Sequence, residues 1–314
     1  MEEALYSHLG FFNTDQVRSD KEGDFLTSPE VSKYFGKIIR NWIHSESNVK
    51  NIIEIGSGTG SLIEQIGIKE ITAVELSSTA REELIKKGID THTTIDELTT
   101  KTSDLIFGNE ILDNIPCSIG LYKDEGWYEK VVLLEENSLA YGLRPIRNEE
   151  LDWINKNNIV PNEDYEFEIQ VNIDKFLNSV IKKINPGKIL LFDYGYEQKN
   201  RDKRMYSSLL RTYKNHHLSV DPIDDPGNVD ITYDVNFSSI SSELKYLGYD
   251  VTLKLQRDFL LDNGFNIFFD ELQEKYIDAE GIEKLKINSE LSGLKAIVDS
   301  NGLGGFYCLT AEKL

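Results

Sequence analysis

Short apolar runs alternate with helix-like stretches along this chain. Runs rich in Ile, Val and Leu recur as "NIIEIG", "EITAVEL", "SDLIFGNE", "KILLFDYG", "YDVTLKLQ" and "GFYCLTAEK". Buried strands that alternate with amphipathic segments are typical of a parallel sheet with helices on both faces. The pattern therefore predicts an α/β fold with a mostly parallel sheet. The last two runs lack the usual parallel crossover, so we expect an antiparallel pair at the sheet edge.

Two regions interrupt this rhythm. Between residues 115 and 172, "LYKDEGWYEKVVLLEENSLAYGLRPI" alternates like a hairpin with Asp124, Glu125 and Gly126 as its turn, and "NNIVPNEDYEFE" is expected as a loop. Between residues 196 and 236, the chain is rich in Asp, Pro and Gly and poor in helical period. Both regions follow predicted strands at their carboxyl ends, where open parallel sheets bind ligands. We therefore expect lids or binding loops there.

A glycine-rich loop follows the first apolar strand. In "IIEIGSGTG", Gly56, Gly58 and Gly60 allow a tight turn and a close approach of a ligand to the backbone. A dinucleotide fingerprint would need glycine at position 61, where Ser61 stands. The spacing instead resembles class I methyltransferases that bind S-adenosylmethionine, with a plain strand-to-helix turn as the alternative. Glu75, which ends the next strand, can accept hydrogen bonds from both ribose hydroxyls.

An acidic pair follows the third apolar run. In "SDLIFGNEILDNIPC", Glu110 and Asp113 stand three residues apart, so both would face the same way on a helical turn. Paired acceptors orient a planar guanidinium and draw its charge to one side, which suits methyl transfer to the free nitrogen. The alternative is that Asp113 caps a short helix and Glu110 is solvated.

The chain is strongly acidic. Its 314 residues carry a net charge of -20, from 54 acidic and 34 basic side chains. Such a surface repels phosphate backbones, so we expect no nucleic-acid partner. A cationic partner, such as an arginine-bearing protein segment, would be attracted, whereas the alternative is that the charge serves solubility alone.

Cysteine and histidine content also limits the possibilities. Cys117 and Cys308 are too few to frame a fold, and although one disulfide is possible, sparse cysteine favours a reducing, cytoplasmic location. The N-terminus lacks the layout of a signal peptide, and we expect no membrane span because no run of about 18 apolar residues occurs. We predict no metal site, because no C-x-x-C or H-E-x-x-H spacing is present.

Three longer segments are more specific. "GDFLTSPEVSKYFG" at 23–36, "NEILDNIP" at 109–116 and "DPGNVDITYDVNF" at 225–237 resemble the MidA-type proteins, a family of S-adenosylmethionine-dependent methyltransferases that includes a mitochondrial arginine methyltransferase. "LLFDYGY", "LQRDFLL" and "GLGGFYCL" follow in the family's order, so the resemblance spans nearly the whole chain.

The resemblance implies roles for particular residues. Asn109 would lie with Glu110 and Asp113 between cofactor and substrate. The implied cofactor residues are Gly23, Asp24, Thr27, Ser28, Glu54, Gly56, Gly58, Gly60 and Glu75. Without the family, the Thr-Ser-Pro-Glu run predicts a helix start with Ser28 as its N-cap, and an exposed helix N-terminus also suits a ligand-facing position.

Some positions depart from the family. Ser57 replaces the usual proline of the glycine loop, Ile111 and Leu112 replace two aromatic residues, and Gly304 and Gly305 replace charged residues. We expect the first change to leave cofactor binding intact and the others to alter surfaces near the substrate.

A histidine pair lies in the second interrupting region. His216 is a candidate base, with His217 beside it, although an exposed or capping pair is the alternative reading.

The combined reading is a Rossmann-like class I methyltransferase with a seven-stranded, mostly parallel sheet. We expect an N-terminal helical segment at 1–45, a core at 46–115 and 173–314, a hairpin insertion at 116–172 and a second insertion at 197–236. The predicted reaction is methylation of an arginine on a partner protein. A small-molecule O- or N-methyltransferase and a non-catalytic assembly factor are the alternatives, and the oligomeric state stays open.

Overall fold

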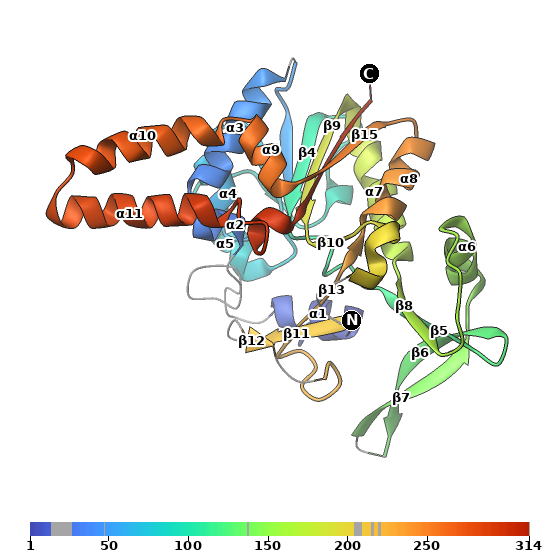
Figure 1. Cartoon of the computed structure of the whole chain (residues 1–314). Helices are drawn as coiled ribbons and strands as arrows, with labels where there is room; N and C mark the ends of the chain where they lie inside the picture. Colours follow the sequence, from blue (N-terminus) through green and yellow to red (C-terminus); the bar gives the residue numbers. More distant parts are fainter. Residues whose placement is uncertain are drawn as a thin grey trace.

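The centre of the molecule is a seven-stranded sheet in the order β15-β16-β9-β4-β1-β2-β3 (Figure 1). The computed structural model describes residues 1–13, 27–46, 48–136, 138–203, 209–214, 217–218 and 221–313. The strands of the sheet are β1 (Ile52–Ile55), β2 (Ile71–Val74), β3 (Thr91–His92), β4 (Ser103–Asn109), β9 (Ile184–Asp193), β15 (Asp250–Leu255) and β16 (Tyr307–Glu312). β16 is antiparallel to both of its neighbours, and the other pairs are parallel. The predicted sheet and its antiparallel edge are confirmed.

Helices cover both faces of this sheet because its strands are apolar on both sides. In β4, Leu105 and Phe107 point to one side and Ile106 points to the other. The first side is covered by α3 (Tyr34–Ser45), α4 (Ser61–Ile66), α5 (Ser78–Lys86), α9 (Gln256–Asp262), α10 (Phe265–Asp278) and α11 (Gly281–Ala296). The second side is covered by η2 (Ile95–Glu97), α7 (Val171–Lys183) and α8 (Phe237–Tyr246). Because the strands are buried on both faces, their sequences are continuous apolar runs.

The connection from β15 to β16 contains the helical hairpin α10–α11, which projects from the body of the protein (Figure 1). Leu272 and Leu291 are buried in the core cluster of that side, whereas Ile277 and Ile282 near the hairpin tip are exposed. The hydrophobic pattern did not predict this hairpin, because its core-facing residues are widely spaced among charged ones.

The first insertion folds as a four-stranded antiparallel sheet in the order β7-β6-β5-β8. It contains β5 (Ser118–Lys123), β6 (Gly126–Glu135), β7 (Ser138–Pro145), α6 (Asn148–Lys156) and β8 (Tyr165–Ile169). The predicted turn is confirmed, and Asp124 and Glu125 take the left-handed conformation there. The prediction of a loop over residues 157–168 is wrong for its last four residues, because residues 165–168 belong to β8. Phe167 is buried against Trp153 of α6, and the alternation Tyr-Glu-Phe-Glu-Ile was the overlooked signal.

The second insertion contains a three-stranded antiparallel sheet in the order β12-β11-β13. Its strands are β11 (Leu210–Lys214), β12 (His217–Leu218) and β13 (Asp230–Tyr233), and it is framed by η3 (Gln198–Lys203) and by the parallel pair β10 (Gly195–Tyr196) and β14 (Val235–Asn236). The N-terminal elements α1 (Glu2–Tyr6) and η1 (Phe11–Asn13) pack here, with Leu5 and Phe11 buried against Val229 and Ile231. The start of the chain therefore lies on the second insertion.

Both cysteines are free thiols, Cys117 half-buried and Cys308 buried, so the possible disulfide is not formed. Within the described ranges, no helix has the length and apolar character needed to cross a membrane.

A glycine in η4 (Leu303–Gly305) provides a test of the packing. A Cβ atom on Gly304 would lie 2.3 Å from the carbonyl carbon of Val298. Because that neighbour is backbone, we expect Gly304→Ala to lower the free energy of unfolding by roughly 1–3 kcal/mol in urea denaturation. The control is Gly126→Ala, whose nearest contact would be an ordinary 3.6 Å, with an expected change of under about 0.5 kcal/mol. Equal effects of the two substitutions would contradict the packing argument.

Candidate active site

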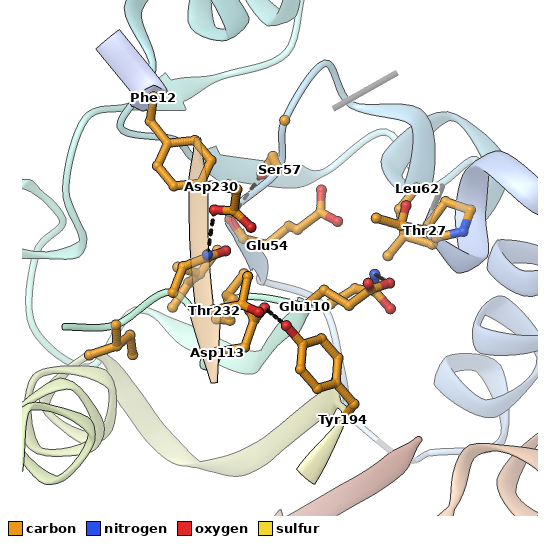
Figure 2. A pocket seen from close by; sticks show the side chains of 18 of the residues that line it. Phe12, Thr27, Glu54, Ser57, Leu62, Glu110, Asp113, Tyr194, Asp230 and Thr232 are labelled. Atoms are coloured by element: carbon orange, nitrogen blue, oxygen red, sulfur yellow. Dashed lines mark hydrogen bonds between the residues drawn. The ribbon is translucent and has the colours of Figure 1, made fainter. Parts of the chain in front are cut away.

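A cavity of about 880 Å³ opens at the carboxyl ends of the central strands. Ile55 of β1, Val74 of β2, Asn109 of β4 and Tyr194 after β9 all line it. Figure 2 shows Glu54, Glu110 and Asp113 in this cavity, with the Tyr194 hydroxyl hydrogen-bonded to Asp113. The volume falls in the upper part of the range of small-molecule sites, roughly 300–1,000 Å³. The cavity lies at the sheet edge where open α/β folds bind their ligands.

The glycine loop after β1 depends on conformations that other residues rarely adopt. Gly56, Gly58 and Gly60 have φ angles of +69°, +51° and +86°. A Cβ on Gly56 would lie 2.3 Å from Cγ2 of Ile111. Gly56 and Gly58 line the cavity, whereas Gly60 lies behind it as the N-cap residue of α4. The glycines therefore fit one narrow turn that exposes backbone to the cavity.

Glu75 fixes this loop from the end of β2. Its carboxylate accepts a hydrogen bond from the Gly58 N–H at 2.8 Å and from the Ser77 N–H at 2.7 Å. Arg81 donates to the Glu75 carbonyl oxygen at 2.8 Å. Burial raises the pKa of the Glu75 carboxyl, although these donors oppose the rise. The carboxylate oxygens have further lone pairs, so Glu75 can hold the loop and also face a ligand.

Glu54 lies under the loop and is almost wholly buried, with 2% of its surface exposed. Its Oε2 atom is buried without a hydrogen-bond partner, and burial raises the pKa of this carboxyl well above its ordinary value. Ser57, the family departure in the loop, donates its hydroxyl to the Glu54 carbonyl oxygen at 3.2 Å. A buried acceptor that lines a cavity without a partner is suited to a ligand that donates a hydrogen bond.

The helix α2 (Ser28–Val31) closes one side of the cavity. Its N-cap residue is Thr27, which lines the cavity, so the prediction that Ser28 is the N-cap was wrong by one residue. The reason is that the Ser28 hydroxyl is buried, where it accepts from Gln256 Nε2 at 3.0 Å. The Ser28 N–H donates to the carboxylate of Glu110. Gly23 and Asp24 lie outside the described residues.

The acidic pair does not lie on a helical turn, so that expectation was wrong. Glu110 takes the left-handed conformation with φ +53°, and the segment after it is a non-helical turn. Asn109 Nδ2 donates to Glu110 Oε1 at 3.0 Å, and the Glu110 N–H donates to the Phe192 carbonyl. Asp113 is 4% exposed, accepts from the Tyr194 hydroxyl, and has its Oδ1 atom buried without a partner. Both carboxylates nevertheless line the same cavity, so neither the helix cap nor the solvated alternative describes them.

Asp193 at the end of β9 holds this turn. Its buried carboxylate accepts from the N–H groups of Leu112 at 2.8 Å, Asp113 at 3.3 Å and Tyr194 at 2.9 Å. Tyr233 of β13 donates its hydroxyl to the Leu112 carbonyl at 2.9 Å. The turn is thereby fixed from two strands that lie far apart in the sequence.

Acidic side chains dominate the lining, and a bound cation would favour their ionised forms. Burial, with Asp113 nearby, raises the pKa of Glu110 to about 8. Burial also raises the pKa of Asp113 to about 6, opposed by the Tyr194 hydroxyl and by Arg211. Among the described lining residues, Arg211 is the one basic side chain, and the acidic ones are Glu30, Glu54, Glu75, Glu110, Asp113, Asp230 and Asp234. The cavity is therefore suited to a cation.

Several lining residues were not predicted. Tyr6 and Phe12, from the N-terminal segment, stack with ring centroids 5.5 Å apart, and Tyr6 donates to the Asn114 carbonyl at 3.1 Å. No local pattern marks them, because they reach the cavity only through packing on β13. The second insertion supplies Asp230, Thr232 and Asp234, which lie in the quoted family segment at 225–237, and Arg211, which lies well before it. Asp193 and Tyr194 end an apolar strand, so the rule that selected Glu110 would also have found them.

The departures from the family have mixed outcomes. Ile111 packs against Gly56 and lines the cavity, whereas Leu112 is fully buried in the core, so the expectation that it alters a substrate-side surface was wrong. Gly305 lines the cavity and Gly304 is buried behind it.

The remaining catalytic candidate, His216, lies outside the described residues, and His217 is described only as backbone of β12. In the parts of the chain that the structure describes, no three His, Cys, Asp or Glu residues are grouped to hold a metal ion.

The family model described as "Putative S-adenosyl-L-methionine-dependent methyltransferase" matches residues 36–252. The chain belongs to this MidA-type family. The "Protein arginine methyltransferase NDUFAF7 homolog, mitochondrial" of Caenorhabditis elegans is 25% identical over 308 residues, covering 83% of this chain and 70% of the relative. The protein with the same printed name from Drosophila melanogaster is 24% identical over 279 residues, covering 70% of this chain and 60% of the relative.

The fold is also that of a solved MidA-type structure. A Burkholderia thailandensis protein crystallised with S-adenosyl-homocysteine superposes with a TM-score of 0.86 at 21% identity, covering 99% of this chain and 86% of the other. This likeness shows that the two proteins share one fold over nearly the whole of the present MidA-type chain.

The residues of this MidA-type cavity fit the family's cofactor, S-adenosylmethionine. The glycine loop offers backbone without Cβ atoms, and Glu75 offers a carboxylate beside it. The unpartnered Glu54 oxygen suits a donor such as an ammonium group. These residues would hold the cofactor next to the acidic turn.

Two substitutions test this cofactor site. We expect Gly58→Val to abolish S-adenosylmethionine binding, because the side chain occupies the approach to the loop and the φ of +51° is strained for valine. Glu75→Ala removes an acceptor that also anchors the loop, so we expect binding to weaken by roughly 1–3 kcal/mol in titration calorimetry. Exposed Glu82→Ala is the control. Unchanged affinity in both site variants would remove these residues from the cofactor site.

Glu110 also gives a prediction about pH. Its carboxyl binds a proton more tightly in the folded protein than in the unfolded chain, because burial raises its pKa from 4.5 to about 8. Stability that depends on this proton is therefore lost as the pH rises towards 8. We expect the free energy of unfolding of Glu110→Gln to fall less between pH 5 and pH 8.5 than that of the unsubstituted protein, measured by urea denaturation. Parallel pH curves would show that Glu110 ionises normally.

Proposed function

We propose that this chain transfers a methyl group from S-adenosylmethionine to the guanidinium of an arginine on a partner protein. The observation that carries the proposal is the buried, unpartnered Asp113 Oδ1 atom in a cavity with Glu110 beside it. A guanidinium carries five N–H donors and a positive charge. It would donate a hydrogen bond to the unpartnered Asp113 oxygen and balance the charge of the carboxylates. The names of the mitochondrial relatives, which are 24–25% identical to this chain, support the same acceptor.

The chain's own groups have separable tasks in this reaction. Asp113 accepts N–H hydrogen bonds through Oδ1, while the Tyr194 hydroxyl on Oδ2 keeps the carboxylate in place. The second carboxylate, Glu110, orients the other edge of the guanidinium. When bound, the cofactor supplies an electrophilic methyl group on a sulfonium sulfur. One carbon–sulfur bond breaks as the carbon–nitrogen bond forms.

Glu110 is suited to take the proton that the methylated nitrogen releases. Burial holds the pKa of its carboxyl at about 8, so a proton on its Oε atoms is stable near neutral pH. A bound guanidinium lowers that pKa by its charge and keeps Glu110 ionised before transfer. Once this proton has moved to Glu110, the methylated guanidinium is left with a single positive charge, as before the transfer, and Glu110 can release the proton to solvent.

The decisive test uses amide replacements. We expect Glu110→Gln and Asp113→Asn each to lower methyl transfer by at least ~100-fold, because a positioned charge is lost while the shape is kept. The assay supplies methyl-labelled S-adenosylmethionine and a pool of 15-residue peptides with arginine at the centre, and labelled methylarginine is counted after hydrolysis. Cofactor affinity should stay near that of the unsubstituted protein, and Glu82→Gln is the matched control.

The outcomes separate the rival functions. Near-normal transfer in both variants would contradict the acidic clamp. Equal loss of cofactor binding would place the pair in the cofactor site. Label appearing only on small molecules of a cell extract, with none on arginine, would favour the small-molecule methyltransferase.

A further inference from the structure

Several large apolar side chains are exposed together at the outer end of the β6–β7 hairpin. Val132 is 51% exposed, Leu134 75%, Tyr141 41% and Leu143 48%. The registers Val132↔Tyr141 and Lys130↔Leu143 place these four on one face of the ribbon. Leu133 belongs to the opposite face, where it lies over Gly142. The four residues form a continuous surface, here called the hairpin face.

β7 is also an edge strand within the described sheet. It pairs with β6 on one side, and the sheet order β7-β6-β5-β8 gives it no second neighbour. Proteins usually blunt such an edge with lysine, proline, inward charges or a short strand. β7 has 8 residues, its proline is the last of them, and Arg144 is its one charged side chain. Among the described residues, no other strand pairs with the outer edge of β7 before Pro145.

The hairpin face continues toward the active-site cavity. The Tyr141 hydroxyl donates to Asp221, which begins the segment leading to Asp230 and Thr232 of the cavity lining. At its other end, the sheet joins the acidic turn, because β5 begins three residues after Ile115 of the lining. Figure 1 shows the hairpin projecting beside the second insertion. The hairpin face and the cavity lining are therefore joined through the segment between Asp221 and Asp230.

Charge decides between the possible occupants. A second copy of the chain would bring another net charge of -20, and its own Glu135 and Glu136 sit at the hairpin tip. Asp221 and Asp224 add negative charge beside Tyr141. The cation on the hairpin face, Lys130, lies over the Tyr141 ring and is paired with Glu166 at 3.3 Å. Self-association is therefore opposed, whereas a basic segment with apolar side chains complements both the charge and the face.

We propose that the hairpin face and the edge of β7 dock an extended, arginine-bearing segment of the substrate protein. The segment adds a strand to β7 through backbone hydrogen bonds, and alternate apolar side chains lie on the hairpin face. This proposal rests on the proposed function for the choice of arginine, but not for the docking itself. It gives the first insertion the task of selecting extended segments of protein.

The experiment measures binding, so it does not depend on methyl transfer. Fluorescein-labelled pools of 15-residue and 5-residue peptides, each with a central arginine and otherwise random, are titrated with the full chain by fluorescence anisotropy. We expect the longer pool to bind at least ~10-fold more tightly, as an added strand with apolar anchors requires. Val132→Thr with Leu134→Thr keeps β-forming residues and should bring the two pools within about 2-fold of each other.

A matched control removes exposed apolar residues elsewhere. Ile282→Gln with Leu285→Gln changes side chains that are 74% and 70% exposed on α11, and it should leave the length dependence unchanged. Amide hydrogen exchange over residues 138–145 should slow when the longer pool binds the unsubstituted protein. Equal affinity for both pools, or unchanged exchange in β7, would overturn the proposal.

Two further outcomes separate the ideas. If the unsubstituted protein sediments as a dimer and the variant with Val132→Thr and Leu134→Thr sediments as a monomer, a second copy covers the hairpin face. That result would contradict the proposal. A matched pool with central lysine tests the acceptor. If it binds as tightly, with the same dependence on the hairpin, docking is supported and the arginine assignment fails.

Discussion

One buried carboxylate determines the geometry of the acceptor side. Asp193 ends the central strand β9, and its carboxylate accepts the N–H groups of Leu112 and Asp113 in the turn that follows β4. Burial raises the pKa of Asp193 well above its usual range, with Asp113 and Glu110 adding to the effect, so these donors offset part of a costly position. Because the turn is held there, Glu110 adopts its left-handed backbone at a cost of roughly 1–2 kcal/mol and Asp113 faces the cavity.

The cavity concentrates acceptors and leaves some of them unused. Oxygens of Glu54, Asp113 and Thr232 are buried without partners, and each lines the same space. Such atoms lower the stability of the free protein, and a ligand with donors recovers that loss. A sulfonium cofactor and the proposed guanidinium acceptor are both cations, so the same acidic side chains suit both ligands. Arg211 is the one basic side chain among the described lining residues, and its ion pair with Asp234 at 2.9 Å balances its charge.

The sequence predicted those features that depend on local pattern. Strand runs buried on both faces, the glycine loop and the acids at strand ends all follow from residue type and spacing, as Gly58 and Glu75 illustrate. Features that depend on tertiary packing were missed. Tyr6 reaches the cavity only because Leu5 and Phe11 pack against Val229 and Ile231, more than two hundred residues later in the sequence. Asp113 and Glu110 line the same cavity because Asp193 fixes the turn between them, and not because of helical spacing. The Ser28 hydroxyl does not cap α2, because it is hydrogen-bonded to Gln256.

The docking of the N-terminus on β13 has a consequence for biosynthesis. Leu5 and Phe11 leave the ribosome long before Val229 and Ile231, which bury them. At roughly 5–20 residues per second, the first segment waits on the order of 10–45 s for its partner surface. During that interval its aromatic and aliphatic side chains are available to chaperones. A nascent or truncated chain that ends before β13 therefore lacks one wall of the catalytic cavity, and methylating capacity arises only at a late stage of translation.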